Sequence, residues 1–166
     1  MTNIQRNFKV CIPTTDHAEE ICNIIIQSIT QVCAVDYKND PVIIDEWLSN
    51  KTPENVAQWL QSSSNRSCAV VDVERNKLIG YALMNNDGEI LLNYVLPDYL
   101  SMGIGKTLLN KIEDMARDLK LNKLLAVSTI TAKKFYERNG FIKNGEPEYV
   151  GQILGDFPLV KYLDSI

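Results

Sequence analysis

The stretch from Leu96 to Glu113, LPDYLSMGIGKTLLNKIE, places two glycines directly before an apolar pattern with helical spacing. Gly103 and Gly105 have no Cβ atom, so a ligand can approach the backbone closely there. The N–H groups of a first helical turn have no intrahelical partners and carry the positive end of the helix dipole. The stretch therefore predicts a site for an anion such as a pyrophosphate, with Lys106 adding a positive charge.

Two common nucleotide-binding motifs do not fit this loop. A Walker A loop would need its first glycine at position 100, which is Leu100. A dinucleotide-binding fingerprint would need its third glycine at position 108, which is Leu108. The bare Gly-x-Gly pattern leaves one further alternative open, namely that the glycines only permit a tight turn from a strand into a helix.

The segments around the loop predict a mixed α/β domain. Helical spacing and start signals predict helices that begin near Asp16 (with Glu19 in a capping box), Val42, Thr52, Ile104 and Thr131. Strand-like runs are Phe8–Ile12, Ser67–Val73, Leu78–Met84, Glu89–Val95, Lys123–Val127, Phe141–Ile142, Tyr149–Ile153 and Leu159–Leu163. Short turns join the second, third and fourth of these runs into an antiparallel meander. The crossover helix that follows predicts parallel pairing of Glu89–Val95 with Lys123–Val127.

Composition narrows the class of protein. The 166 residues fit a single domain from residue 1 to residue 166, and 17 basic against 21 acidic residues disfavour a nucleic-acid partner. Four cysteines without Cys-x-x-Cys spacing predict reduced thiols, and the single histidine, His17, makes a metal site improbable. No apolar run reaches the length of a membrane span. We therefore expect a cytoplasmic protein with no membrane partner and no metal.

Two motifs together resemble a known family. NYVLPDYLSMGIGKTLL resembles the acetyl-CoA loop of the GNAT superfamily of N-acetyltransferases, and TAKKFYERNGF resembles its Ala-x-x-Phe-Tyr-Glu-x-x-Gly-Phe signature. The order of the predicted elements is also similar over nearly the whole chain. The resemblance implies a GNAT-like fold, with a central, mixed, mostly antiparallel sheet of about six or seven strands flanked by about four helices.

The resemblance also implies an activity. It implies transfer of the acetyl group of acetyl-CoA, as cosubstrate, to a primary amine of a small molecule or peptide by direct attack, and it is compatible with a homodimer. An alternative is a non-catalytic acyl-CoA-binding or sensor domain with the same fold. This alternative is motivated by two departures from the family pattern, Leu100 in place of Arg or Gln and Thr129 in place of a frequent Asn.

The resemblance implies site residues as well. Those carried over for acetyl-CoA are Tyr94, Val95, Leu96, Ser101, Met102, Gly103, Ile104, Gly105, Lys106, Thr107 and Thr129. Glu89 matches the catalytic Glu of the histone-acetylating branch and would act as the base, because an alkylamine is mostly protonated near neutral pH. The alternatives are that Glu89 is a solvated charge at a strand end and that the proton leaves through water.

Tyr136 matches the family's general acid, which protonates the thiolate of CoA. The alternative is an aromatic side chain at the boundary of the core. Asp36 and Tyr37 are weaker candidates for holding an acceptor amine, by charge and by ring face. For these two residues the alternative is a polar loop without a role in binding.

Overall fold

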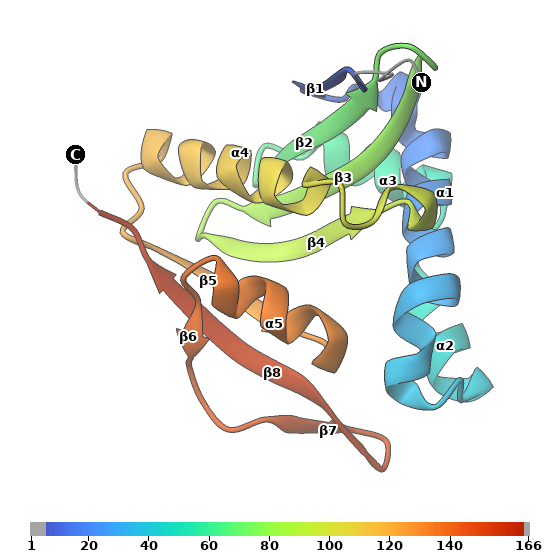
Figure 1. Cartoon of the computed structure of the whole chain (residues 1–166), viewed down its shortest axis with the longest axis vertical. Coiled ribbons are helices and arrows are strands. Elements are labelled where there is room, and N and C mark those ends of the chain that lie inside the picture. The colour runs from blue at the N-terminus through green and yellow to red at the C-terminus, as the bar shows by residue number, and fades with distance from the viewer. Residues whose placement is uncertain (1–5, 165–166) are drawn as a thin grey trace, which may run out of the picture.

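Eight strands form one open sheet in residues 6–164, the part of the chain that the computed structural model describes (Figure 1). The strands are β1 (Phe8–Cys11), β2 (Asn65–Asp72), β3 (Lys77–Asn85), β4 (Glu89–Val95), β5 (Lys123–Ser128), β6 (Ile142–Lys143), β7 (Glu148–Val150) and β8 (Ile153–Tyr162). Their order is β1-β2-β3-β4-β5-β8-β6, with β7 paired to β8. Among the described strands only β4 and β5 pair in parallel, which confirms both the meander and the crossover.

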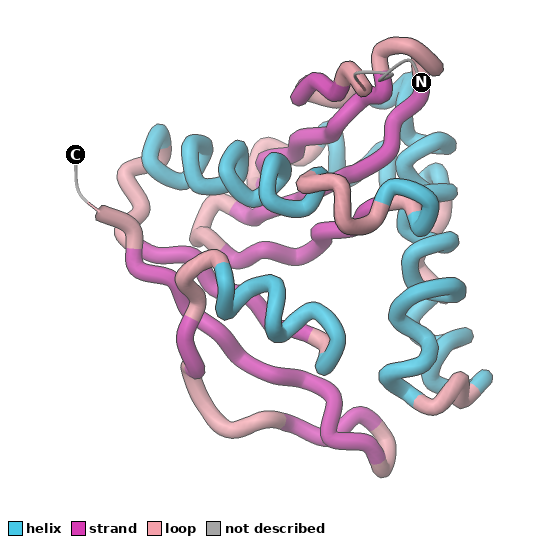
Figure 2. Tube along the Cα trace, in the orientation of Figure 1, coloured by secondary structure: helices cyan, strands magenta, loops and turns pink. Residues whose placement is uncertain are grey.

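Five α-helices cover the sheet in the described residues: α1 (Ala18–Ser28), α2 (Pro41–Leu48), α3 (Pro53–Gln61), α4 (Ile104–Asp118) and α5 (Ile130–Arg138). Helices α1 and α3 lie on one face of β2–β4, and α4 lies across the other face (Figures 1 and 2). Helix α5 packs against β5 and β8. Two short helical turns, Ile29–Cys33 and Ala34–Tyr37, continue α1. The predicted fold class is confirmed, with more strands and helices than expected.

Two local predictions were wrong. The predicted strand Tyr149–Ile153 is a hairpin, because the chain reverses at Gly151, where φ is 61°. The predicted capping box at Asp16 lies two residues earlier, where the N–H of Thr14 donates to Nδ1 of His17 at 3.0 Å. A short 3-10 turn therefore precedes α1, which begins at Ala18.

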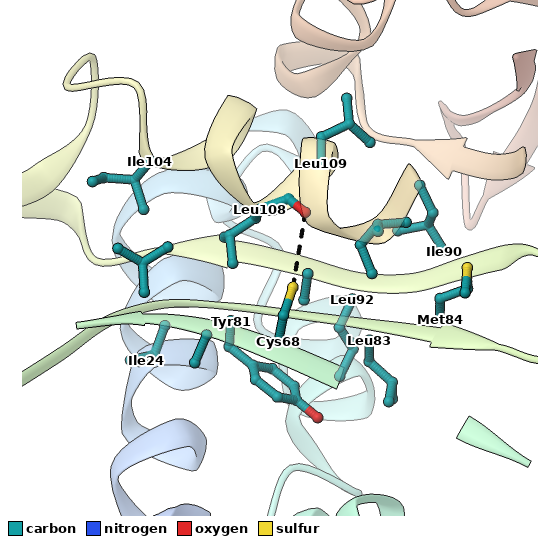
Figure 3. Close-up of a cluster of buried hydrophobic side chains, with 14 of the residues drawn as sticks. Ile24, Cys68, Tyr81, Leu83, Met84, Ile90, Leu92, Ile104, Leu108 and Leu109 are labelled. Carbon is teal, nitrogen blue, oxygen red and sulfur yellow. Dashed lines mark hydrogen bonds between the residues drawn. The ribbon is translucent and has the colours of Figure 1, made fainter. Parts of the chain in front are cut away.

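The core lies on both faces of β3. Every residue from Leu78 to Met84 in this strand is buried, because helices cover it from two sides. Leu108 reaches the strands from α4, and Ile24 reaches them from α1 on the opposite face (Figure 3). Burying each large aliphatic side chain of this kind contributes roughly 1.5–3 kcal/mol. The centre of the sheet is thus the rigid part from which β4 extends.

A bulge bends β4 away from β5. Leu83 and Met84 of β3 pair with Leu92 and Ile90 of β4, so Leu91 is an extra residue on β4. A bulge of this type bends its strand and increases the local twist. The parallel pairing of β4 with β5 comprises only Glu89 with Leu125 and Ile90 with Ala126, and it ends where the bulge begins. From Leu91 onward the two strands diverge, and the sheet opens between them (Figure 2).

A buried ion pair ties the two diverging halves together on the side of α4. Glu113 of α4 is 8% exposed and pairs with Lys161 of β8. Arg117 lies 3.7 Å from the other oxygen of the same carboxylate. Since a buried charge without its partner is strongly destabilising, this contact holds α4 and β8 in one arrangement.

We expect Glu113→Ala to lower the free energy of unfolding by about 3 kcal/mol, the lower end for breaking a buried pair, because it leaves Lys161, 24% exposed, without its partner while Arg117 keeps Asp114. Asp114→Ala is the matched control. Asp114 is 68% exposed and also bridges Arg117, so its loss should change stability by less than about 1 kcal/mol. Urea denaturation of both variants measures the difference. Equal effects would show that the buried pair does not join the two halves.

Candidate active site

A cavity of about 580 Å³ opens where β4 and β5 diverge. Its walls come from the end of β4, the loop before α4, the first turn of α4, the whole length of α5 and the end of α1. The lining residues are Ser28, Val32, Cys33, Asn93, Tyr94, Val95, Tyr99, Leu100, Ser101, Gly103, Ile104, Gly105, Lys106, Thr129, Thr131, Ala132, Phe135, Tyr136, Arg138 and Asn139. Segments from three separate parts of the chain thus meet at one cavity.

The first turn of α4 presents backbone donors to this cavity. The hydrogen bond from the N–H of Thr107 to the carbonyl of Gly103, 3.1 Å, begins the intrahelical series. The N–H groups of Ile104, Gly105 and Lys106 precede it and have no intrahelical acceptor. Gly103 is the N-cap residue with φ of 82°, and no heavy atom lies within 4 Å of the place where a Cβ would stand. The open space in front of these donors fits an anionic group, as at other helix N-termini.

A buried carboxylate anchors the loop that leads to α4. The hydroxyl of Tyr99 donates to Oδ2 of Asp72 at 2.8 Å and accepts a hydrogen bond from Nη1 of Arg75 at 3.0 Å. Tyr99 is 3% exposed and is one of the lining residues of the cavity. Burial by itself would raise the pKa of Asp72, but hydrogen bonds from Tyr99 and the backbone, with the charge of Arg75, outweigh it and lower the pKa. The β2–β3 hairpin therefore fixes the position of the glycine loop.

The free edge of β4 forms the floor of the cavity. The N–H of Leu96 donates to the carbonyl of Ile79 on β3 at 2.8 Å. Backbone groups alternate in direction along a strand, so those of Val95 point away from β3, to the side where β5 has departed. Oγ of Ser28 donates to the carbonyl oxygen of Val95 at 2.8 Å. The N–H of Val95 thus faces the opening between the strands.

Tyr136 lies on the cavity wall and is 7% exposed. Its ring makes edge contacts with Phe135 and Phe141, with centroids 5.3 Å and 5.1 Å away. Burial raises the pKa of Tyr136 to about 12, against a smaller lowering by the hydrogen bond from the Asn93 side chain. The phenol therefore keeps its proton throughout the physiological range and is held in one orientation by packing.

Two side chains cap the start of α5 at the rim of the cavity. Oγ1 of Thr129 accepts a hydrogen bond from the N–H of Ala132 at 3.3 Å. The carboxylate of Asp36 accepts from the N–H of Thr131 at 3.2 Å and also from the Thr131 hydroxyl. Asp36 thus connects the turn that follows α1 with the start of α5. This structural role differs from the predicted contact with an acceptor amine.

The structure brings together most, but not all, of the predicted site residues. Those on the cavity wall are Tyr94, Val95, Ser101, Gly103, Ile104, Gly105, Lys106, Thr129 and Tyr136. Leu96 is buried beside β3, Met102 lies next to Arg6, and the hydroxyl of Thr107 donates to the carbonyl of Gly103. Tyr37 is 4% exposed and packs edge-on against Trp47, so its ring is not presented to the cavity.

Glu89 also lies apart from the lining residues. It begins β4, before the bulge, and pairs with Leu125 in the section where the two strands still run together. Its exposed carboxylate accepts from Nδ2 of Asn85 at 3.3 Å. The structure thus places the predicted base in the closed part of the sheet, whereas the cavity begins near Asn93.

Sequence reasoning missed several residues of the cavity. Asn93 is a polar side chain inside the apolar run EILLNYV, and this contrast was a signal for a functional position. Arg138 stands two residues after Tyr136 and is a second cation, with Lys106, on the lining. Ser28 and Cys33 come from α1 and the turn after it, and no local pattern connected them with the glycine loop.

Comparison with known proteins identifies a family model and solved structures that this chain resembles. A family model described as the acetyltransferase (GNAT) domain matches residues 33–162. A search of curated proteins found no match.

Over residues 6–164, no helix combines the length and apolar character needed to cross a membrane. The same residues contain no cluster of three or more His, Cys, Asp or Glu that could hold a metal ion.

Solved structures share the fold at low sequence identity. The PaiA N-acetyltransferase from Thermoplasma acidophilum, in complex with coenzyme A, is 19% identical with a TM-score of 0.78, covering 95% of this chain and 99% of that one. A GCN5-related N-acetyltransferase from Rhodopseudomonas palustris is 20% identical with a TM-score of 0.78, covering 98% and 99%. The ribosomal-protein-S18-alanine N-acetyltransferase from Escherichia coli is 15% identical with a TM-score of 0.66, covering 96% of each chain.

We expect Tyr99→Phe to lower the thermal midpoint, and to lower it more at neutral pH than at acid pH. The variant loses the hydrogen bond that lowers the pKa of Asp72, and a lowered carboxyl pKa gives its full stabilisation above the usual value of 3.8 and loses it as the pH falls through the lowered pKa. The difference from the wild type should therefore shrink as the pH falls below 3.8. Thermal midpoints measured across this range test the prediction.

Tyr162→Phe is the control, because Tyr162 is 64% exposed and should leave the thermal midpoint unchanged at both pH values. A loss for Tyr99→Phe that is constant from neutral to acid pH would show that the phenol acts by packing alone and not through Asp72.

Proposed function

This chain belongs to the GNAT acetyltransferase family, and we propose that it transfers the acetyl group of acetyl-CoA to the primary amine of a small molecule or peptide. The observation that carries the proposal is the meeting of three groups at one cavity. These are the free N–H donors that open α4, the buried phenol of Tyr136 and the outward backbone of Val95. The N–H donors of α4 can bind an anion, the phenol of Tyr136 can give up a proton, and the backbone N–H of Val95 can stabilise a developing oxyanion.

The loop before α4 would hold the pyrophosphate of acetyl-CoA. The N–H groups of Ile104, Gly105 and Lys106 would donate to its oxygens, and the open space at Gly103 leaves room for it. Lys106 and Arg138 would add positive charge. Leu100 supplies no polar group, although it lines the cavity, so the anchoring of the loop by Tyr99 and Asp72 is what keeps the backbone donors in place.

The bound cosubstrate supplies an acetyl group activated as a thioester. In the overall step an amide bond forms between the amine nitrogen and the acetyl carbon, the carbon–sulfur bond breaks, the amine gives up one proton, and the sulfur gains one. The N–H of Val95 faces the opening, where it would stabilise negative charge on the acetyl oxygen. The phenol of Tyr136 would deliver the proton to the sulfur and recover one from the amine or from water.

The initial deprotonation of the amine proceeds through water in this proposal. Glu89 lies in the closed part of the sheet and its carboxylate is exposed, so it would act as an outer acceptor of the proton and not touch the amine. A water route was one of the alternatives that the sequence left open, and the position of Glu89 favours it.

Cys33 raises the question of a covalent acetyl-enzyme intermediate, because its thiol lines the cavity. Burial, with a smaller effect of Asp36, raises the pKa of Cys33 to about 12. The nucleophilic form of a cysteine is the thiolate, which is scarce at neutral pH when the pKa is this high. Direct attack by the amine is therefore the proposed route.

Binding without transfer is the competing function. The exposed apolar side chain of Leu100, at the place of a polar family residue, favours this reading. Incubation with acetyl-CoA and a panel of amines, with detection of free thiol, distinguishes the two. Thiol released only when an amine is present supports transfer, whereas stabilisation by acetyl-CoA with no thiol released supports a binding domain.

We expect acetyl-CoA to raise the thermal midpoint, because a ligand at 100 times its Kd adds about 2.7 kcal/mol to the stability of the folded state. ATP with Mg²⁺ should not, since the loop lacks the first Walker glycine. Gly103→Val should abolish the shift, because its side chain would enter the open space in front of the α4 donors. Differential scanning fluorimetry measures all three.

Gly145→Val is the matched control for backbone strain. Gly145 also has positive φ, 135°, and stands outside the cavity, so this variant should lose stability and still respond to acetyl-CoA. Protection by ATP and none by acetyl-CoA would overturn the proposed cosubstrate.

We expect Tyr136→Phe to lower kcat by roughly 10² or more while the affinity for acetyl-CoA stays within about twofold, since the contact matters mainly in the transition state. The loss should be smaller with an acyl donor whose thiol is more acidic, because that thiolate needs less protonation to leave. With a pKa of about 12, the phenol of the wild type should cause no fall in rate between about pH 8 and 10.

Steady-state kinetics with the two donors, together with calorimetric titration of acetyl-CoA, measures these quantities. Equal losses for both donors would assign Tyr136 a positioning role. Full activity in the variant would remove the phenol from the mechanism.

A further inference from the structure

Asn93 lies on β4 just beyond the bulge and lines the cavity. It is the one residue with an amide side chain that this section of β4 contributes. Its Oδ1 atom is buried and accepts no hydrogen bond from any residue in 6–164. Buried polar atoms in native proteins nearly always have a partner, so an orphaned one on a cavity wall indicates a partner that arrives with a ligand. An amide oxygen can only accept, so the missing partner is an N–H or O–H donor.

The other end of the same amide is already engaged. Asn93 and Tyr136 line the same cavity, and hydrogen bonding by the Asn93 side chain lowers the pKa of the phenol. Because Oδ1 has no partner, the amide group that acts on the phenol is Nδ2, which can only donate. This arrangement leaves the proton of the Tyr136 hydroxyl free to point elsewhere, and it directs Oδ1 away from the phenol.

We propose that Asn93 is a substrate-contacting residue of this site, whose Oδ1 accepts an N–H of the acceptor amine while its Nδ2 orients the Tyr136 hydroxyl. The proposal rests on the acetyl transfer proposed above. It places the incoming nitrogen and the proton-donating phenol on the two ends of one planar amide, so that a single side chain sets the position of both. It also gives the site a preference for acceptors that have an N–H to donate.

Two substitutions at Asn93 separate the two contacts. Asn93→Leu has a similar shape and removes both, so kcat should fall at least about tenfold and the KM for the amine should rise by about the same factor. Asn93→Asp keeps an accepting oxygen and loses the N–H donor, so kcat should fall while the KM for the amine does not rise. In both variants the affinity for acetyl-CoA should stay within about twofold of the wild type.

Stability provides a readout apart from activity. Replacing this amide with an apolar side chain of similar shape removes a buried oxygen that has no partner, and that gain offsets the lost contact of Nδ2. Asn93→Leu should therefore leave the thermal midpoint unchanged or raised although kcat falls. A residue with only a structural role would show the opposite, namely a lowered midpoint with unchanged kinetic constants in the folded protein.

Asn86 offers a matched control. It is also an Asn with a buried, unpartnered Oδ1, but it stands in the turn between β3 and β4 and does not line the cavity. Asn86→Leu should leave kcat and both KM values unchanged, even if it alters the midpoint through loss of its bond to the carbonyl of Ser63.

The experiment uses the full chain with acetyl-CoA and three probe amines: benzylamine, 1,4-diaminobutane and an Nα-blocked lysine. Kinetics are measured with the best acceptor, and amine binding is measured as the additional thermal shift of the protein saturated with CoA. An additional shift that Asn93→Leu loses and Asn93→Asp retains supports the proposal. If Asn93→Leu has the kcat, the KM for the amine and the additional thermal shift of the wild type, the role of Asn93 is overturned and the proposed function stands.

Failure of the proposed function gives a different result. A wild-type protein that neither transfers acetyl groups to these amines nor shows an additional shift with them would overturn both statements together. Transfer by the wild type, combined with equal effects of the Leu and Asp variants on the KM for the amine, would overturn only the assignment of Oδ1 to the amine.

Discussion

The separation of β4 from β5 after Ile90 is the constraint on which the rest of this structure depends. A sheet that continued in register would pair the backbone of residues 91–95 with β5 and fill the space that is now a cavity. The extra residue Leu91 bends β4 while β3 holds its other edge in a buried, rigid position. The bulge therefore creates an unpaired strand edge inside the protein, which is stable only because its two sides are fixed independently.

The two sides of the opening are fixed by polar contacts between segments that are distant in the sequence. On the side of α4, Tyr99 connects the glycine loop to Asp72 at the end of β2. On the side of α5, Asp36 connects the turn after α1 to the first residues of the helix. Glu113 and Lys161 close the far end between α4 and β8. With these contacts in place, the helix N-terminus proposed to bind an anion and the helix that carries Tyr136 are both held at the wall of one cavity.

The cavity combines a buried phenol with a few polar groups on apolar walls, and this combination suits proton transfer. The aromatic packing of Tyr136 removes its phenol from water and raises its pKa, while the outward backbone of Val95 and the amide of Asn93 supply the polar contacts that apolar walls cannot. A phenol that stays protonated at neutral pH keeps a proton to donate, and a buried amide oxygen without a partner can only accept. The site therefore presents donors and acceptors whose roles are set before a ligand arrives.

The sequence determined the class of fold, the order of the elements and the glycine loop, because these follow from local rules. Apolar spacing, turn residues and helix start signals act over a few positions, and Gly103, Gly105 and Tyr136 stand in short motifs. The divergence of β4 and β5 was decided only in the tertiary structure, since a single bulged residue, Leu91, is not marked by its type. For the same reason the sequence assigned Glu89 and Asp36 to the site, whereas register places Glu89 before the opening and Asp36 at the start of α5. Asn93 and Ser28 became site residues only because packing brought the end of β4, the end of α1 and α5 to one cavity.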